Sequence, residues 1–290
     1  MEMQIDKASY RALVEAAVQT LSTFSIGFAI PTKAPHGEID AVSGGSGTLV
    51  AIEKFQGILT ASHVIRELRK HESVGLILVS PIKTELHNLS FKMEMARDYS
   101  FSPQGDVSDG PDIGFLVPPP DVLGALNARM SFFNLSIRRT SMLERPQPIE
   151  NGFWILSGIV GERTSDSSPE QGLSKIKIFR GMHGAGIVTK EFKRDGFDYL
   201  TFEALYNEFY EGPESYGGFS GGGLWQMLVK PDGEMLKISE FLLSGVAFYE
   251  TAIRRNANME KIREIICHGR ASIYWSVVEN IRKETSNTSL

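Results

Sequence analysis

Cysteine is almost absent from this chain of 290 residues, in which Cys267 is the single example. One cysteine cannot form a disulfide within the chain, and this favours a reducing compartment over an oxidising one. The six histidines contain no H-x-x-x-H pair, so zinc-ligand spacing is missing as well. The sequence therefore predicts a cytoplasmic protein without a metal site.

Long hydrophobic runs and a surplus of positive charge are also missing. No apolar stretch approaches the roughly 20 residues that span a bilayer. Residues 1–7 contain two acids and no apolar core of a secretory signal. Lys and Arg total 30 against 35 Asp and Glu, which gives a formal net charge of −5. Because phosphate binding needs clustered positive charge, we expect neither a nucleic-acid nor a membrane partner.

The sequence does contain apolar residues with helix-like spacing near both of its ends. Apolar residues recur at three- and four-residue steps over 7–21, which predicts an amphipathic helix. The apolar residues of 272–281 suggest a closing helix, followed by a polar tail from Lys283. Residues 121–148 form a connector of mixed character behind the prolines of 118–120, which break any regular element.

Between the ends, short segments rich in β-branched and aromatic residues are separated by Gly, Pro, Asn and charged residues. This pattern is typical of strands joined by turns. No helical segments alternate regularly with the strands, so antiparallel barrels or sandwiches are favoured over a doubly wound parallel sheet. The predicted strands are 24–30, 47–52, 56–60, 74–79, 90–95, 113–117, 154–158, 176–179, 187–190, 199–202, 223–227 and 242–249.

Three short stretches carry residue types that act together in acyl transfer: His63 after a strand, Asp112 before an apolar strand, and Ser220 between glycines. A serine hydroxyl is a weak nucleophile until an imidazole accepts its proton. The imidazole in turn needs a carboxylate on its other nitrogen. Glycine permits the backbone geometry that points two N–H groups at one oxyanion.

These stretches resemble the motifs of the chymotrypsin/trypsin superfamily of serine proteases. Residues 60–63, T-A-S-H, resemble its T-A-A-H block, and residues 112–116, D-I-G-F-L, resemble its D-I-A-x-L block. Residues 218–222, G-F-S-G-G, match its G-x-S-G-G block, and residues 46–50 resemble the strand before the histidine. The resemblance covers roughly residues 24–281. It implies a mainly β fold of two antiparallel Greek-key barrels, with an extra N-terminal helix and a C-terminal helix.

The resemblance also implies where the domains begin and end and which catalytic role each residue has. Residues 1–23 would form the helical extension, 24–130 the first barrel with His63 and Asp112, 131–268 the connector and second barrel with Ser220, and 269–290 the C-terminal helix and tail. Ser220 would attack a peptide bond, with His63 as base and then acid and Asp112 as its orienting partner. The N–H groups of Gly218 and Ser220 would stabilise the oxyanion. The implied function is endopeptidase cleavage of protein or peptide substrates, without a metal or an organic cofactor.

The chain departs from the family immediately before the nucleophile. Phe219 stands where the family has an aspartate that pairs with a newly cut N-terminus, and Gly223 stands where a proline is usual. The family's paired cysteines are missing too. Activation by N-terminal cleavage is therefore in doubt. We hypothesise instead that a regulatory partner or a conformational change orders residues 216–222, with the helix over 7–21 as the docking element.

Substrate preference is suggested by Glu214, six positions before the nucleophile, where the family sets the base of its primary specificity pocket. A partly desolvated carboxylate there would select Arg or Lys. Ala247, Phe248 and Tyr249 resemble the strand whose backbone pairs with substrate, and Glu250 follows where glycine is usual. The alternative is that Glu214 faces solvent, since no disulfide holds its loop.

Two other functions are open at this point. The chain could be a protease-fold module that has lost activity and only binds a partner. It could also be an α/β-hydrolase, because G-x-S-x-G fits the nucleophile elbow of that fold. That fold places the acid and the histidine after the serine, which leaves only Asp232 and His268. Its helix after the nucleophile would begin with glycines that each cost about 1 kcal/mol relative to alanine.

Overall fold

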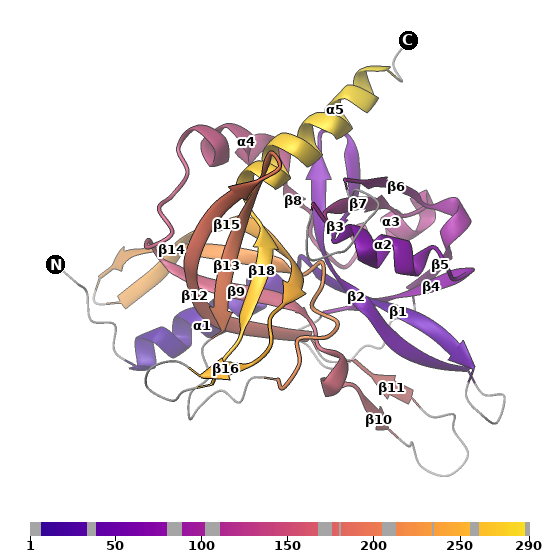
Figure 1. Cartoon of the computed structure of the whole chain (residues 1–290), viewed down its shortest axis with the longest axis horizontal. Helices are drawn as coiled ribbons and strands as arrows, with labels where there is room; N and C mark the ends of the chain where they lie inside the picture. Colours follow the sequence, from indigo (N-terminus) through magenta and orange to yellow (C-terminus); the bar gives the residue numbers. More distant parts are fainter. Residues whose placement is uncertain are drawn as a thin grey trace.

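The computed structural model describes residues 7–33, 39–79, 89–101, 111–167, 176–179, 181–204, 213–233, 235–255 and 261–287. Within these residues the fold is mainly β, with one curled sheet formed by the first half of the chain and a closed ring of strands formed by the second (Figure 1). No helix in the described part is both long enough and apolar enough to serve as a membrane span.

The first sheet has eight strands in the order β5-β4-β1-β2-β3-β7-β6, and β8 pairs with β2. Neighbours are antiparallel except for β8 and β2, which are parallel. The strands are β1 (Ser25–Lys33), β2 (Ile39–Ile52), β3 (Phe55–Thr60), β4 (Ser73–Leu78), β5 (Leu89–Lys92), β6 (Arg97–Ser100), β7 (Gly114–Val117) and β8 (Phe133–Asn134). Because β8 belongs to this sheet, the first half extends past the predicted boundary at residue 130.

The sheet's two edge strands, β5 and β6, are consecutive segments of the chain. Only the 3-10 turn η1 (Met93–Met95) and Ala96 separate them. β5 pairs only with β4 and β6 only with β7, so no ladder joins these two strands among the described residues. The closed first barrel that the sequence suggested is therefore a curled sheet with two edges among the described residues.

The second half closes into a barrel in the order β12-β13-β18-β15-β14-β9, with β9 pairing with β12. All its neighbours are antiparallel, and closure leaves no unpaired edge. The strands are β9 (Phe153–Ile159), β12 (Gly181–Arg194), β13 (Phe197–Ala204), β14 (Gly223–Asp232), β15 (Met235–Glu250) and β18 (Glu264–His268). Two small ladders stand apart, β10 (Ser165–Ser167) with β11 (Ile176–Ile178) and β16 (Arg254–Arg255) with β17 (Lys261–Ile262).

Helices appear at both ends, as the sequence predicted, and also inside the chain. They are α1 (Lys7–Ser22), α2 (Ser62–Leu68), α3 (Pro120–Asn127), α4 (Leu135–Glu144), and α5 (Val278–Asn287), which continues the π-helical segment η4 (Ser272–Val277). Pro120 begins α3 rather than breaking it, because the first turn of a helix does not use the N–H that proline lacks. The tail predicted from Lys283 is helical to Asn287.

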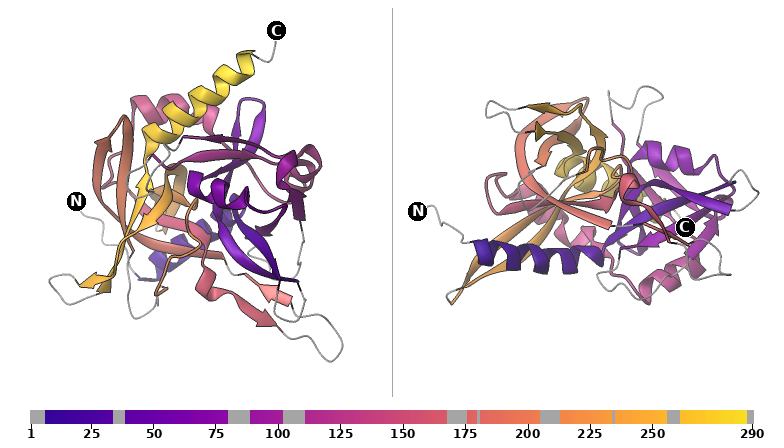
Figure 2. Two further views of the ribbon diagram at one scale, coloured as in Figure 1. Left: turned by 45° about the vertical axis from the view of Figure 1, so that its right-hand side comes forward. Right: turned by 90° about the horizontal axis from the view of Figure 1, so that it is seen from below.

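The N-terminal helix packs against the chain's own barrel. Ala17 and Leu21 are fully buried in a cluster with the barrel residue Met227, and Tyr10 lies edge-on to Phe153 with ring centroids 6.3 Å apart. Figure 2 shows α1 lying along the outside of the barrel strands. The apolar stripe that the sequence offered as a docking element is therefore part of the protein's own core. A partner would reach only the exposed face of α1.

Close contact between the two halves positions the site. The ring of Trp225 on β14 lies 4.9 Å from Phe133 on β8, and its indole stacks on Phe24 at 5.7 Å. A Cβ at Gly27 on β1 would come within 2.3 Å of Ile159 Cγ1 on β9, so only glycine permits this approach. The halves therefore meet along β1 and β9.

Candidate active site

His63 and Asp112 are brought together by the pairing of β3 with β7. His63 is the second residue of α2, which begins directly after β3, and Asp112 lies two residues before β7. Thr60 pairs with Gly114, so these strand ends are adjacent. His63 Nδ1 is hydrogen bonded to Asp112 Oδ2, and the His63 backbone N–H donates to Asp112 Oδ1 at 2.7 Å. The carboxylate thus holds both the backbone and the ring of His63.

The other ring nitrogen of His63 is open. Its side chain is 27% exposed, whereas that of Asp112 is 1% exposed. Within the described residues no hydrogen bond reaches His63 Nε2. A proton on Nδ1, facing the carboxylate, would leave Nε2 with a free lone pair. This is the tautomer that a general base needs.

A second histidine lies behind Asp112. The Asp112 backbone N–H donates to His268 Nε2 at 2.8 Å, across 156 positions of the sequence. His268 is fully buried at the end of β18, and its ring lies 4.7 Å from that of Phe248 and 4.9 Å from that of Tyr199. Burial lowers the pKa of His268 to about 4, so the ring is neutral at pH 7 and can accept. Sequence reasoning missed this role, and no local signal marks it.

Ser220 lies in a tight loop that leads directly into β14. Gly218 and Gly221 have φ values of +97° and +89°, which a residue with a Cβ rarely adopts. Phe219 is buried and packs on Tyr216 with ring centroids 5.2 Å apart. The residue that replaces the family's aspartate therefore acts here as a hydrophobic anchor. A strand after the serine, in antiparallel sheets, also shows that the α/β-hydrolase interpretation is wrong.

The backbone N–H groups of residues 217–222 fall into two sets. Four of them donate within the described residues: Gly217 to Ser215 Oγ, Phe219 to Tyr216 O, Gly221 to Ala247 O and Gly222 to Phe219 O. The N–H groups of Gly218 and Ser220 donate to no described group. These are the two donors that the sequence predicted for an oxyanion.

The carbonyl groups of residues 217–220 are all engaged, and this fixes the direction of the two free N–H groups. Gly217 O accepts from Gly161 N at 2.8 Å, Gly218 O from Ser46 Oγ at 2.6 Å, Phe219 O from Gly222 N at 2.7 Å and Ser220 O from Ser46 N at 2.8 Å. A peptide group is planar, so holding its oxygen also orients its N–H. Ser46, on β2 of the first sheet, was not predicted as a functional residue.

A pocket of about 550 Å³ lies between the two halves, and both His63 and Ser220 line it. Its remaining walls come from the first half, chiefly β2 and α2, and from Gly218. Ser220 Oγ makes no hydrogen bond within the described residues. The serine and His63 therefore line the same pocket without a hydrogen bond between them. A second pocket of about 570 Å³ shares Val42, Ser43 and Gly218 with it and is also lined by Glu162 and Ser215.

The four predicted substrate-binding residues do not form one common surface in the structure: Glu214 is exposed, and the other three lie on β15. Glu214 is exposed and does not line either of these pockets. Ala247, expected to contact substrate, instead uses its N–H and its carbonyl to bind the 217–222 loop, so it supports that loop. The ladder between β15 and β14 ends at Val246, so Tyr249 pairs only with Ile266 on β18, and Phe248 lies at the bulge where the β15–β18 register skips one residue. Phe248 is buried and Tyr249 is 44% exposed.

Comparisons with known proteins give little further information. No protein-family model and no curated protein matches the chain. One solved structure with similarity comes from work on aromatic interactions in the coupled folding and binding of the intrinsically disordered Sesbania mosaic virus VPg protein. That match has 14% identity and a TM-score of 0.40, and it covers 86% of this chain and 95% of the other. A match at this level supports no conclusion about the fold or the function of this chain.

Proposed function

We propose that this chain is a serine endopeptidase that cleaves protein or peptide substrates through an acyl-enzyme. One observation carries the proposal: the pocket between the halves is lined by His63 and Ser220, with Asp112 bonded to the far side of the imidazole. The unused N–H groups of Gly218 and Ser220 add a place for an oxyanion in the same loop.

The proposed chemistry uses these groups in both half-reactions, acylation and deacylation. Ser220 Oγ attacks the peptide carbonyl carbon while His63 Nε2 takes the hydroxyl proton, and the Asp112 carboxylate stabilises the imidazolium. The tetrahedral oxyanion accepts hydrogen bonds from the N–H groups of Gly218 and Ser220. His63 then gives its proton to the leaving amine as the C–N bond breaks. Water hydrolyses the acyl-enzyme by the same steps, with His63 again as base.

Strand order supports assigning both halves to one kind of Greek-key barrel. Around the closed barrel, the strands numbered in chain order follow 1-2-3-6-5-4. The first sheet follows the same order if β5 and β6 are counted as one strand interrupted by η1. In this proposal the active site lies between two related barrels, as the resemblance to chymotrypsin-like proteases implies.

A preference for Arg or Lys at the cleavage position stays a prediction. Its strongest candidate, Glu214, is exposed, and Glu250 is ion paired with Arg263. Peptide-library profiling of the wild type and Glu214→Gln tests the role of Glu214. A basic preference that is lost in the variant supports it, and an identical profile in the two proteins removes it.

A fluorophosphonate probe tests the proposal directly, because it phosphonylates only an activated serine. We expect stoichiometric labelling of the wild type, with the adduct mapped to Ser220 by mass spectrometry and absent in Ser220→Ala. His63→Ala should label slower by orders of magnitude, since the two side chains act as one unit. A wild type that stays unlabelled and leaves an unfolded protein substrate intact would overturn the proposal.

The second candidate function is a catalytically silent module that binds a peptide. The observation that favours it is that no hydrogen bond joins Ser220 Oγ to His63 among the described residues. Such a module would bind peptides in the inter-half pocket without turnover and would leave the fluorophosphonate unreacted.

A further inference from the structure

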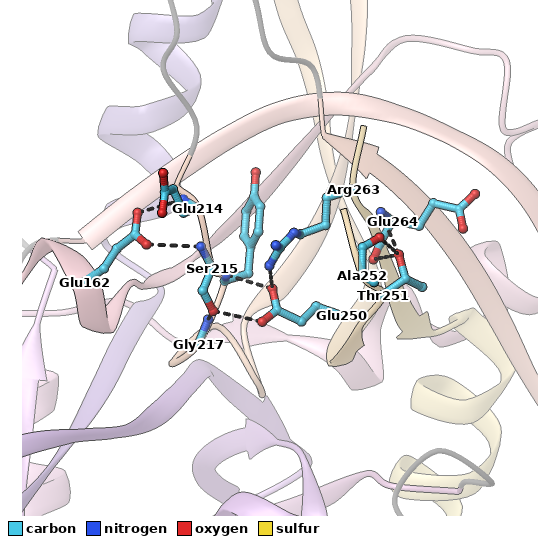
Figure 3. A network of polar contacts seen from close by, with 10 residues as sticks. Glu162, Glu214, Ser215, Gly217, Glu250, Thr251, Ala252, Arg263 and Glu264 are labelled. Carbon is cyan, nitrogen blue, oxygen red and sulfur yellow. Dashed lines mark hydrogen bonds and ion pairs between the residues drawn. The ribbon is translucent and has the colours of Figure 1, made fainter. Parts of the chain in front are cut away.

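The segment just before the 217–222 loop is held by two carboxylates. The N–H groups of Glu214 and Ser215 donate to the two oxygens of Glu162, at 2.9 Å and 3.0 Å. The Tyr216 N–H donates to Glu250 Oε2 at 2.8 Å, and Ser215 Oγ donates to Glu250 Oε1 at 2.9 Å (Figure 3). Hydrogen bonds to a charged acceptor are about twice as strong as neutral ones.

The two carboxylates come from separate parts of the barrel. Glu162 belongs to the 3-10 turn η3 (Gly161–Arg163) directly after β9, whereas Glu250 ends β15. Ser215 links both, because its N–H donates to Glu162 and its hydroxyl to Glu250. The segment is thus tied both to the turn after β9 and to the end of β15, and β14 lies between these two strands in the barrel.

Arg263 completes the arrangement on the Glu250 side. Its Nη1 lies 2.5 Å from Glu250 Oε2, and the side chain of Arg263 is only 10% exposed. Removing a partner from a poorly solvated ion pair is costly, since it leaves the other charge unpaired. The pair therefore keeps Glu250 in place as an acceptor for the segment.

The hydrogen bonds of Glu162 and Glu250 also restrain the residues next to the free N–H of Gly218. Gly217 N donates to Ser215 Oγ, and Gly217 O accepts from Gly161 N at 2.8 Å, next to Glu162. Gly217 O, in the peptide between residues 217 and 218, is therefore held by the turn that carries Glu162, and Gly217 N, in the preceding peptide, is held by a hydroxyl that is bonded to Glu250. Loss of either carboxylate would loosen residues 214–216, which lead into this peptide, and the Gly218 N–H would then be held less firmly in its direction.

We propose that Glu162 and Glu250 are positioning residues that keep the 217–222 loop in its oxyanion-binding arrangement, and that they do so without cleavage of the chain. The proposal rests on the proposed protease function. It explains how a chain with Phe219 before the nucleophile orders this loop. Two carboxylates of the same chain bind the segment 214–216, and the buried phenyl ring of Phe219 anchors the loop in the core.

Charge-removing variants test this proposal. Glu162→Gln and Glu250→Gln keep the side-chain shape but lose the charge and one acceptor. Glu240→Gln is the matched control, because Glu240 lies on the same strand as Glu250 and pairs with an arginine, Arg138, at 3.1 Å. We expect kcat to fall at least tenfold in both test variants with KM within about twofold, since loss of a whole oxyanion donor costs about 10²- to 10³-fold. Affinity for a peptidyl boronate should fall in parallel with kcat/KM.

Hydrogen exchange of the peptide spanning residues 213–222 gives a readout that does not depend on activity. Exchange should be faster in both test variants and unchanged in Glu240→Gln. Wild-type exchange and wild-type kcat in Glu162→Gln and Glu250→Gln would overturn the proposal. A wild type that fails to react with the fluorophosphonate overturns the protease function instead. Should Glu250→Gln not fold, Ser215→Ala removes the hydroxyl that links Glu250 to Gly217 N and leaves both carboxylates in the chain, and unaltered exchange and kcat in that variant would be equally decisive against the proposal.

Discussion

His268 illustrates how one buried residue can support a site that it does not enter. Its neutral ring accepts the Asp112 backbone N–H, and aromatic side chains surround it. The same burial that lowers its pKa to about 4 keeps its lone pair available at neutral pH. Asp112 is thus held through its backbone by His268 and through its carboxylate by His63.

We expect His268→Phe to lower both stability and kcat. Phenylalanine keeps a ring of similar size but leaves the buried Asp112 N–H without an acceptor, which costs about 1–3 kcal/mol. A displaced Asp112 would misalign His63 and reduce kcat more than it changes KM. Urea unfolding and steady-state kinetics measure the two effects.

His183→Phe is the matched control for that substitution. His183 is also a largely buried histidine with its pKa lowered to about 4 by burial, but its Nε2 contacts Ser22 of α1 at 3.0 Å, away from Asp112. This variant should lose stability and retain kcat per folded molecule. Equal kcat in His268→Phe and the wild type would show that His268 has no positioning role.

At the scale of elements, the site depends on one strand of the first sheet touching one loop of the second half. Ser46 on β2 donates its N–H to Ser220 O and its hydroxyl to Gly218 O, and its Oγ accepts from Ile159 N at 2.7 Å. A single side chain thus joins β2, β9 and the 217–222 loop. The relative position of the two halves and the orientation of the loop are therefore coupled.

Ser46→Ala should uncouple them. The substitution leaves the Ile159 N–H and the Gly218 carbonyl unpaired, which we expect to cost about 1–3 kcal/mol of stability and to slow fluorophosphonate labelling of Ser220. Ser25→Ala is the control: it lies on β1 of the same sheet, and its buried Oγ bonds to Leu21 O at 2.8 Å and to Ser157 Oγ rather than to the loop. If both variants label at the wild-type rate, the Ser46 link does not support the loop.

At the scale of the whole molecule, His268 is buried and His183 is largely buried, and both rings are neutral at pH 7. The pKa values of His183 and His268 are both lowered to about 4 by burial, against about 6.5 for an exposed histidine. Between pH 6.5 and 4 the unfolded chain therefore binds more protons than the folded one. Because stability rises with pH wherever the unfolded state binds more protons, it must fall as pH drops through this window.

We expect each histidine to contribute up to about 3 kcal/mol to this loss, with no further contribution above about pH 7. Urea unfolding at pH 7.5, 6 and 5 measures it. The difference between the wild type and the His183→Phe, His268→Phe double variant isolates the histidines from the carboxylates. A double variant with the same pH dependence as the wild type would refute the assignment.

Local patterns in the sequence determined much of this protein. The 3.6-residue period of residues 7–21 predicted α1 because a helix with an apolar stripe must bury it. Short β-branched segments predicted a mainly β fold, and three motifs predicted that His63, Asp112 and Ser220 belong to one site. The helix and the mainly β fold are confirmed, because each depends on residues that are close in the chain, whereas the shared site of the three motifs stays a prediction.

Only the tertiary structure decided what those patterns contact. The stripe of α1 packs on the chain's own barrel rather than on a partner, and the first sheet stays open between β5 and β6. The contacts of His268 with Asp112 and of Ser46 with the 217–222 loop join residues more than 150 positions apart. Periodicity and motif spacing report which face of a segment must be buried, but the partner of that face is set by how the two halves pack.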